Sequence, residues 1–214
     1  MALFSAVIFD FDYTLADSSR GVQECINNAL VRLGLPPASP NEIKKTIGMS
    51  LPDTLVALTG KAHKDQGNEF YSLFIKRADE VMVDMTKVFE DVPKVIELLS
   101  DKGVSLGIAS TKFRYRIETI LRRVGLLEHF DVIVGGEDVS RHKPDPESIL
   151  LAIERLGANK SALYVGDSPT DAEAAKRAGI PFVAVLSGVT PREAFSDYPF
   201  YHIIETLAEL VDLL

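Results

Sequence analysis

The sequence has little cysteine, little histidine and no long apolar run. Cys25 is the single cysteine among 214 residues, which excludes an internal disulfide and favours a reducing compartment. The four histidines show no metal-ligand spacing, which argues against a zinc site. No apolar run reaches the roughly 20 residues that a membrane span needs. The apolar run near the start lacks a basic flank and stops at Asp10, so it indicates a strand and not a signal peptide. We therefore expect a cytoplasmic protein without a membrane partner.

Basic residues are also fewer than acidic ones, with 23 lysines and arginines against 31 aspartates and glutamates. The net charge is −8, which argues against a broad surface for nucleic acid or for a membrane. A local basic pocket remains compatible with this balance, and a phosphorylated substrate would need such a pocket or a metal ion. The content of 46% hydrophobic and 25% charged residues is that of an ordinary globular chain with a substantial core.

Short β-rich runs recur along the chain, and most are apolar at both alternating positions, as in strands covered on both faces. They occupy residues 5–9, 104–109, 131–134, 162–165 and 181–185. From the second run onward, helical stripes separate them, at residues 92–99, 117–124 and 149–156. This alternation predicts an α/β fold, a Rossmann-like parallel sheet with helices on both faces.

The interval between the first and second strands is far longer than one crossover requires. Helical patterns fill it, at residues 22–33, 41–47, 51–58 and 70–81. We therefore expect an inserted α-helical cap at residues 16–85. Residues 1–15 and 86–214 would form the core domain.

Two carboxylates, Asp10 and Asp12, follow the first strand in the segment VIFDFDYTL. Side chains two apart in a strand point to the same side, so we expect these two to converge. At about 5 Å their repulsion would be roughly 3 kcal/mol, and burial would add a desolvation penalty. Proton sharing, a bound cation or water could each relieve it.

Polar residues also follow the later strands, in the segments STK, RHKPDPE and GDSPTD. Residues just past the carboxyl ends of parallel strands line one crevice. We therefore expect one pocket to contain Asp10, Asp12, Ser110, Lys143, Asp167 and Asp171. Four acids around one lysine leave an excess of negative charge, which a hard divalent cation such as Mg²⁺ would offset.

This set of groups suits phosphoryl transfer. One carboxylate can attack and form a covalent intermediate, and the other can protonate the leaving group and later activate water. Mg²⁺ and Lys143 can neutralise phosphoryl oxygens, and Ser110 with backbone N–H groups at a helix start can hold a phosphate. We expect the nearby Lys112, Arg114 and Arg116 to form a solvated helix face.

Four motifs, FDFDYTL, IAST, HKPDP and VGDSPTD, resemble in sequence and order those of the haloacid dehalogenase superfamily of phosphatases. The resemblance covers essentially the full length and is closest to the phosphoglycolate-phosphatase-like members with a helical cap. It implies that Asp10 is the nucleophile that becomes a phosphoaspartate. It also implies that Asp12 is the acid/base, with its backbone carbonyl on the metal.

The same resemblance assigns the remaining polar residues. Ser110 would hydrogen-bond the phosphoryl oxygens, and Lys143 would tie the phosphate to the nucleophile. Asp167 would ligate Mg²⁺ directly, and Asp171 would support the metal, with water as one route. The metal site would thus involve Asp10, Asp12, Asp167 and Asp171.

Two positions depart from the family pattern. Tyr13 stands where glycine is usual, and His142 precedes the lysine where a small residue is usual. Tyrosine lacks the backbone freedom of glycine, which leaves room for a different turn. Its ring could also line the cavity beneath the cap. The expected substrate contacts are Tyr13, Thr14, Ser110, Thr111 and Lys143.

The expected function is Mg²⁺-dependent hydrolysis of a small phosphorylated metabolite, with phosphoglycolate and pyrophosphate as the leading candidates by resemblance. A sugar phosphomutase of the same superfamily is the alternative, because it uses the same nucleophile but returns the phosphoryl group to its substrate. A non-catalytic receiver-like signalling module is a further alternative. That module lacks a helical insert, and its phosphorylated acid follows a later strand.

Overall fold

The computed structural model describes residues 4–158 and 161–214. Contacts between residues divide the chain into two compact units. The core unit contains the chain up to Ala16 and from Val88 to Leu214, and the inserted unit spans Asp17–Lys87. These boundaries lie one or two residues from the ones expected from the sequence. No helix in the described ranges combines the length and the apolar character needed to cross a membrane.

A six-stranded sheet forms the centre of the core unit, in the order β5-β4-β1-β6-β7-β8. Its strands are β1 (Ala6–Phe9), β4 (Ser105–Ala109), β5 (Val132–Val134), β6 (Ala162–Gly166), β7 (Phe182–Val185) and β8 (His202–Ile204). Every pairing is parallel, and Phe9 lies opposite both Ile108 and Val165. The predicted parallel sheet is confirmed, and the short edge strand β8 adds to it.

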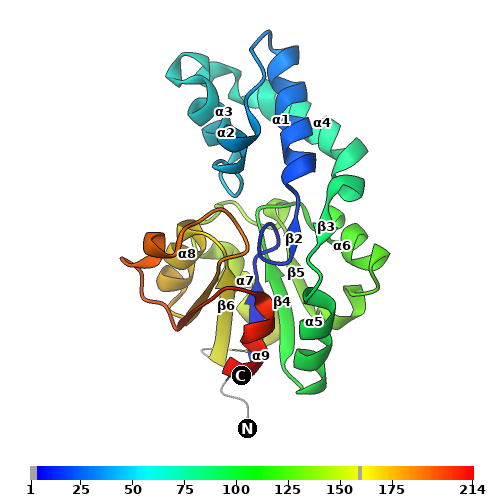
Figure 1. The fold of residues 1–214 in the computed structure, drawn as a ribbon, viewed down its shortest axis with the longest axis vertical. Coiled ribbons are helices and arrows are strands. Elements are labelled where there is room, and N and C mark those ends of the chain that lie inside the picture. The colour runs from blue at the N-terminus through cyan, green and yellow to red at the C-terminus, as the bar shows by residue number, and fades with distance from the viewer. Residues whose placement is uncertain (1–3, 159–160) are drawn as a thin grey trace. The chain divides into compact units, whose positions relative to one another are not determined.

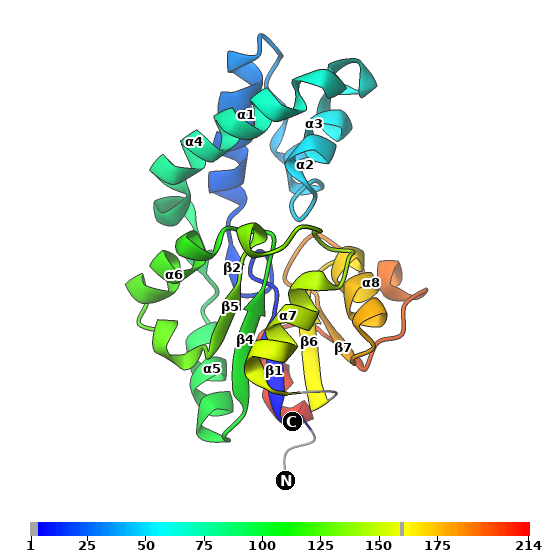
Figure 2. The same ribbon diagram turned by 180° about the vertical axis from the view of Figure 1, so that it is seen from behind.

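Helices cover both faces of this sheet. The helices of the core unit are α5 (Val92–Asp101), α6 (Arg114–Arg123), α7 (Glu147–Leu156), α8 (Pro169–Ala178) and α9 (Leu210–Leu213). Helix α9 lies in front of the strands in Figure 1, and α7 lies in front of them in the view from behind in Figure 2. Helices α7 and α8 contact each other, as do α5 and α9. The predicted α/β layering is therefore confirmed.

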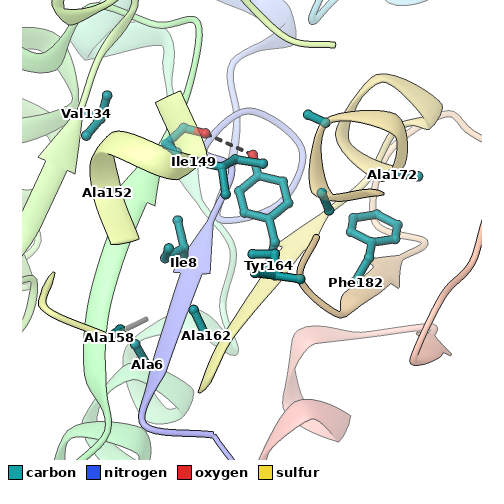
Figure 3. Packing of buried hydrophobic residues seen from close by; sticks show 14 of the residues in the cluster. Ala6, Ile8, Val134, Ile149, Ala152, Ala158, Ala162, Tyr164, Ala172 and Phe182 are labelled. Atoms are coloured by element: carbon teal, nitrogen blue, oxygen red, sulfur yellow. Dashed lines mark hydrogen bonds between the residues drawn. The ribbon is translucent and has the colours of Figure 1, made fainter. Parts of the chain in front are cut away.

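The sheet and the helices α7 and α8 enclose an apolar cluster (Figure 3). Ile8 of β1 and Ala162 of β6 are fully buried in it, together with Phe182 of β7. Tyr164 of β6 belongs to the same cluster although it carries a polar hydroxyl. Burial of this apolar surface, at about 25 cal/mol per Å², fixes the strands whose ends carry the polar motifs.

The inserted unit is helical, and its own core is apolar. It contains α1 (Ser19–Arg32), α2 (Pro40–Lys44), α3 (Leu51–Thr59), the 3₁₀ helix η1 (Lys61–Gln66) and α4 (Gly67–Met85). Helices α1 and α4 contact each other around a cluster that includes Cys25 and Phe70. Ser39 caps α2 in a capping box with Glu42. The connecting strands β2 (Ala16–Asp17) and β3 (Lys87–Val88) pair with each other.

Candidate active site

Three polar residues follow three neighbouring strands at the carboxyl edge of the sheet. Asp10 follows β1, Ser110 follows β4 and Asp167 follows β6. Strand β1 lies between β4 and β6, so these residues come together from both sides of the central strand. The backbone N–H of Asp10 donates to the carbonyl of Val165 at 2.9 Å, which holds the loop after β1 against β6.

Asp10 is a buried carboxylate in an ion pair. Its residue is 6% exposed, and its Oδ1 lies 2.9 Å from Nζ of Lys143. Burial raises the pKa of Asp10 to about 6, although Lys143 opposes that rise. The ionised form that a nucleophile requires therefore depends on nearby positive charge.

Lys143 occupies the centre of the polar residues. Its Nζ donates to Oδ1 of Asp171 at 2.6 Å and to the Tyr164 hydroxyl at 3.0 Å, in addition to its ion pair with Asp10. Burial by itself lowers the pKa of Lys143, but Asp10 and Asp171 more than offset this, so the pKa lies well above its usual value. The side chain is 4% exposed and holds a permanent positive charge.

Asp10, Asp167 and Asp171 form an acidic cluster that could hold a cation. One carboxylate oxygen from each lies within 4.8 Å of the others, and all three residues are buried. Burial raises the pKa of Asp167 well above its usual value, and the charges of Asp171 and Asp10 raise it further. Two of these carboxylates, Asp10 and Asp171, pair with the ammonium of Lys143, and the hard oxygen atoms of all three suit Mg²⁺. The residues present therefore fit the metal expected from the sequence.

Asp171 is held from several sides. It lies in the first turn of α8, where Ser168 forms a capping box with it. Its Oδ2 accepts from the backbone N–H of Ser168 at 3.1 Å, and its Oδ1 accepts from Lys143. A Cβ at Gly166 would lie 2.6 Å from both Cβ and Cγ of Asp171, so only glycine admits this close approach.

A second glycine lies against Asp167. A Cβ at Gly188, in the loop after β7, would lie 2.1 Å from Oδ2 of Asp167 and 3.2 Å from Cβ of Tyr13. The same loop carries Ser187, whose hydroxyl donates to the Tyr13 carbonyl at 2.5 Å. The loop therefore packs both on an acid of the cluster and on the turn that follows Asp12.

Asp12 forms an ion pair with a second lysine, Lys112. Its Oδ1 lies 3.1 Å from Nζ of Lys112, whose side chain is 4% exposed. Helix α6 begins at Arg114, so Lys112 precedes it in the loop, and its carbonyl accepts from the backbone N–H of Gly136 at 3.0 Å. The prediction that Lys112 lies on a solvated helix face is wrong, because the loop turns its side chain toward the acid.

Of the two arginines in the same prediction, Arg114 and Arg116, only one follows it. Arg114 is exposed and pairs with Asp138 at 3.2 Å. Arg116 is 4% exposed, and its guanidinium lies 5.1 Å from the ring centroid of Phe113 and 5.2 Å from that of Tyr115. The prediction of a solvated face is therefore wrong for Arg116, whose guanidinium packs against two aromatic rings.

Ser110 and Thr111 follow directly after β4, at the carboxyl edge of the sheet. Ser110 is buried, its backbone N–H donates to the carbonyl of Val134 at 3.0 Å, and its Oγ accepts from the N–H of Lys112 at 3.3 Å. Thr111 is half-buried. Ser110 thus follows β4 and begins the loop that carries Lys112.

Tyr13 adopts the backbone conformation that glycine usually supplies. Its φ is +60°, the only positive φ among the non-glycine residues that the structure describes. Its N–H donates to the carbonyl of Ala16 at 2.7 Å, which closes the turn. The residue is 6% exposed. Tyr13 therefore keeps a left-handed turn at the cost of backbone strain, typically of order 1–3 kcal/mol.

Thr14 lines a cavity that contains none of the other predicted site residues. The cavity has a volume of about 440 Å³, and Phe89, Ser187 and Leu207 also line it. Thr14 is 1% exposed, and its hydroxyl has no hydrogen-bond partner in the described part of the chain. Thr14 follows Tyr13 in sequence, but it lines a separate cavity of the core unit.

Two residues that contact the acids, Lys112 and Tyr164, are not predicted by the sequence patterns. The ion pair of Lys112 depends on the path of a loop, which no periodicity encodes. Tyr164 stands in the apolar run ALYV, where it is predicted to be an ordinary buried strand residue. The sequence offers one signal for Tyr164. Its hydroxyl stands in an otherwise apolar run, three residues before Asp167.

Comparisons with known proteins agree with this geometry. A family model described as "Haloacid dehalogenase-like hydrolase" matches residues 7–185. A protein named phosphoglycolate phosphatase from Aquifex aeolicus is 36% identical over 184 residues, covering 85% of this chain and 84% of that protein. One of the same name from Escherichia coli K12 is 34% identical over 211 residues, covering 88% of this chain and 83% of that protein.

Solved structures show the same fold. A crystal structure described as a putative haloacid dehalogenase-like hydrolase from Bacteroides fragilis is 44% identical in sequence. It superposes with a TM-score of 0.93 and covers 97% of this chain and 99% of that one.

Proposed function

The chain belongs to the haloacid dehalogenase-like hydrolases and is a phosphatase, and from that premise we propose that it cleaves a small phosphorylated metabolite through a phosphoaspartate on Asp10. The observation that carries this proposal is the buried pair of Asp10 and Lys143, 2.9 Å apart. A nucleophile and a phosphate-binding cation are thereby preorganised in one site. Membership of this hydrolase family excludes the receiver-like alternative.

In the first half-reaction, a carboxylate oxygen of Asp10 attacks the phosphorus atom while the bond from phosphorus to the leaving oxygen breaks. Asp12 donates a proton to that oxygen, which leaves as an alcohol. Lys143 and Ser110 bind the phosphoryl oxygens, where the developing charge is greatest. Thr111 and Tyr13 are proposed to contact the substrate beside this group, and Thr14 to support their turn.

In the second half-reaction, Asp12 takes a proton from water, and the water oxygen attacks the phosphorus of the phosphoaspartate. The bond between Asp10 and phosphorus breaks, and inorganic phosphate leaves. Lys112, whose Nζ lies 3.1 Å from Oδ1 of Asp12, holds this carboxylate in an ion pair. Asp12 thus acts as acid first and as base second.

Mg²⁺ is the proposed cofactor, and when bound it would neutralise charge on the phosphoryl oxygens. The carboxylates of Asp10 and Asp167 and the backbone carbonyl of Asp12 would hold it. Asp171 would act indirectly, because both of its carboxylate oxygens already accept hydrogen bonds from Lys143 and Ser168. An indirect role through water agrees with the way Mg²⁺ retains several waters in proteins.

We propose a small substrate, and the name shared by the relatives makes phosphoglycolate the first candidate, with pyrophosphate second. The inserted unit is proposed to act as a cap that selects the leaving group, as lids do in many enzymes. The single cysteine supports a cytoplasmic location.

The test is a panel of small phosphate esters and pyrophosphate, with released phosphate measured in Mg²⁺, in EDTA and in Ca²⁺. We expect turnover in Mg²⁺, none in EDTA, and inhibition by Ca²⁺, whose larger and looser coordination positions the phosphate poorly. Undiminished turnover in EDTA would overturn the metal assignment.

The same panel distinguishes a hydrolase from a phosphomutase. A phosphomutase would convert one sugar phosphate into its isomer with little release of phosphate, and chromatography of the products would detect this. Stoichiometric phosphate release supports the hydrolase. Isomer formation in its place would support the mutase.

A further inference from the structure

Tyr164 brings a hydroxyl from the apolar core to the polar edge of the sheet. The residue is fully buried in β6, and its ring stacks on Phe182 with centroids 6.3 Å apart. Its hydroxyl donates to the carbonyl of Ala109 at 2.9 Å, the bond drawn as a dashed line in Figure 3. Ala109 immediately precedes Ser110, so this bond ties β6 to the end of β4 at the site.

The same hydroxyl contacts the two charged groups at the centre of the site. Nζ of Lys143 donates to it at 3.0 Å, and Oδ1 of Asp171 lies 3.2 Å away. A phenol carries one hydrogen, so it can donate to Ala109 or to Asp171 but not to both. In either case its oxygen lone pairs accept from the ammonium, because Lys143 has hydrogens to donate and no acceptor.

Two of the contacts of Lys143 are hydrogen bonds, and the third is the ion pair with Asp10. The two hydrogen-bond acceptors are Asp171 and Tyr164, and only Tyr164 is uncharged, whereas Oδ1 of Asp10 accepts no hydrogen bond in the described part of the chain. Burial raises the pKa of the Tyr164 hydroxyl well above its usual value, and the nearby acids raise it further, so it remains neutral. A neutral acceptor can therefore fix one N–H while the ammonium lies in ion pairs with two carboxylates.

We propose that Tyr164 is a positioning residue that holds the ammonium of Lys143 between Asp10 and Asp171. The inference rests on the role proposed above for Lys143 at the phosphoryl group. Without the hydroxyl, one N–H loses its acceptor, and the ammonium moves toward Asp171, its shorter contact at 2.6 Å. It then lies farther from the oxygens of a phosphoryl group on Asp10. Tyr164 itself does not touch the substrate.

The test is Tyr164→Phe, which keeps the ring and its stacking and removes the hydroxyl. We expect kcat to fall about 10- to 100-fold, the usual effect of one lost hydrogen bond to a charged group, with KM changed less than threefold. The affinity for beryllofluoride with Mg²⁺, measured by thermal shift, should fall in parallel, because this phosphoryl mimic needs the same lysine. A wild-type kcat together with wild-type beryllofluoride affinity would overturn the inference.

Phe182→Leu is the matched control, because it disturbs the ring partner of Tyr164 and leaves the hydroxyl in place. We expect a lower melting temperature with kcat within threefold of wild type. If Phe182→Leu lowers kcat and beryllofluoride affinity as much as Tyr164→Phe does, packing explains both effects and the inference fails.

Lys143→Ala, alone and combined with Tyr164→Phe, separates this inference from the proposed function. If Tyr164 acts through Lys143, the double variant should have the same kcat and beryllofluoride affinity as Lys143→Ala. A further loss of 10-fold or more in the double variant would overturn the inference alone. Wild-type kcat in Lys143→Ala would overturn the role of Lys143 and the inference with it.

Discussion

Buried charge distinguishes the two units of the chain. The core unit buries charged side chains, namely Asp10, Lys112, Arg116, Asp167 and Asp171. The buried polar residues described in the inserted unit are Ser18, Thr46, Thr54 and Thr86, and none of these carries a charge. Burying a charge costs several kcal/mol unless it is paired, so such residues are retained where they have a task.

We infer from this difference in buried charge that the two units have different functions. The core unit holds acids and lysines in fixed pairs, as covalent phosphoryl chemistry requires. The inserted unit has an apolar interior, and its charges lie on exposed or partly exposed surfaces, as in the ion pair of Arg77 with Glu24. Such a unit can contribute to substrate selection through surface residues without taking part in bond making.

The largest expected effect is the loss of turnover when Asp10 and Asp12 are each replaced by asparagine. Asp10→Asn removes the proposed nucleophile and should abolish turnover and the phosphoenzyme. Asp12→Asn keeps the nucleophile and should lose roughly the 10²–10⁴-fold that general acid–base catalysis supplies. Both are measured by phosphate release and by trapping the phosphoenzyme with labelled substrate.

Asp197→Asn is the control for this pair, because Asp197 is an exposed acid of the core unit outside the site. It should leave kcat unchanged. A phosphoenzyme that forms on a residue other than Asp10 would contradict the assignment of the nucleophile.

A second test removes the inserted unit. The N–H of Phe89 donates to the carbonyl of Leu15 at 3.1 Å, so the two ends of the core unit lie together and a short Gly/Ser linker can replace residues 17–87. We expect weak hydrolysis of an activated aryl phosphate to remain, because the nucleophile and its partners stay in place. Discrimination among small metabolites should fall roughly 10- to 200-fold, the range that pocket contacts give.

The readout is the ranking of kcat/KM for several phosphate esters in the full and shortened chains. Asp10→Asn in the shortened chain controls for contaminating phosphatases and should be inactive. An unchanged ranking would assign selectivity to the core unit, with Tyr13 and Lys112 as the residues to examine next.

A third test concerns the glycine that lies against Asp167. A Cβ at Gly188 would lie 2.1 Å from Oδ2 of Asp167, so Gly188→Ala must displace that carboxylate. If Asp167 ligates Mg²⁺, the metal affinity should fall roughly 10- to 100-fold, as with other groups that orient a ligand. The measurement is kcat against Mg²⁺ concentration. Val189→Ala, at an exposed neighbour, should match wild type, and a wild-type Mg²⁺ dependence in Gly188→Ala would argue against the role of Asp167.

The sequence predicts the sheet and the acids for one physical reason. Long apolar runs must be buried on both faces, and the polar residue that ends each run must then lie at the sheet edge. Asp10 and Asp167 follow this rule directly. The 3.6-residue periodicity likewise predicts the helices of the inserted unit, because each buries one face.

What the sequence does not predict depends on single contacts. Helix α8 buries mostly alanines, such as Ala172 and Ala175, which form no stripe of large apolar residues. The edge strand β8 has three residues, and its first, His202, is exposed. The pairing of Lys112 with Asp12 and the reach of the Tyr164 hydroxyl follow from loop path and strand register, which local patterns do not encode.

The smallest expected effect is a dependence of stability on pH that comes from the core unit alone. In the metal-free protein, burial raises the pKa of Asp10 to about 6 from its ordinary value of 3.8. Between these values the folded state holds a proton that the unfolded state has released, so the free energy of unfolding falls as pH rises from about 4 to about 6. The loss is at most about 3 kcal/mol. Asp10→Asn should flatten the profile, and Glu69→Gln, at an exposed acid of α4, should not. Mg²⁺ should raise the melting temperature more at pH 7 than at pH 5, since it binds the ionised cluster. A wild-type slope in Asp10→Asn would show that the pH dependence arises elsewhere.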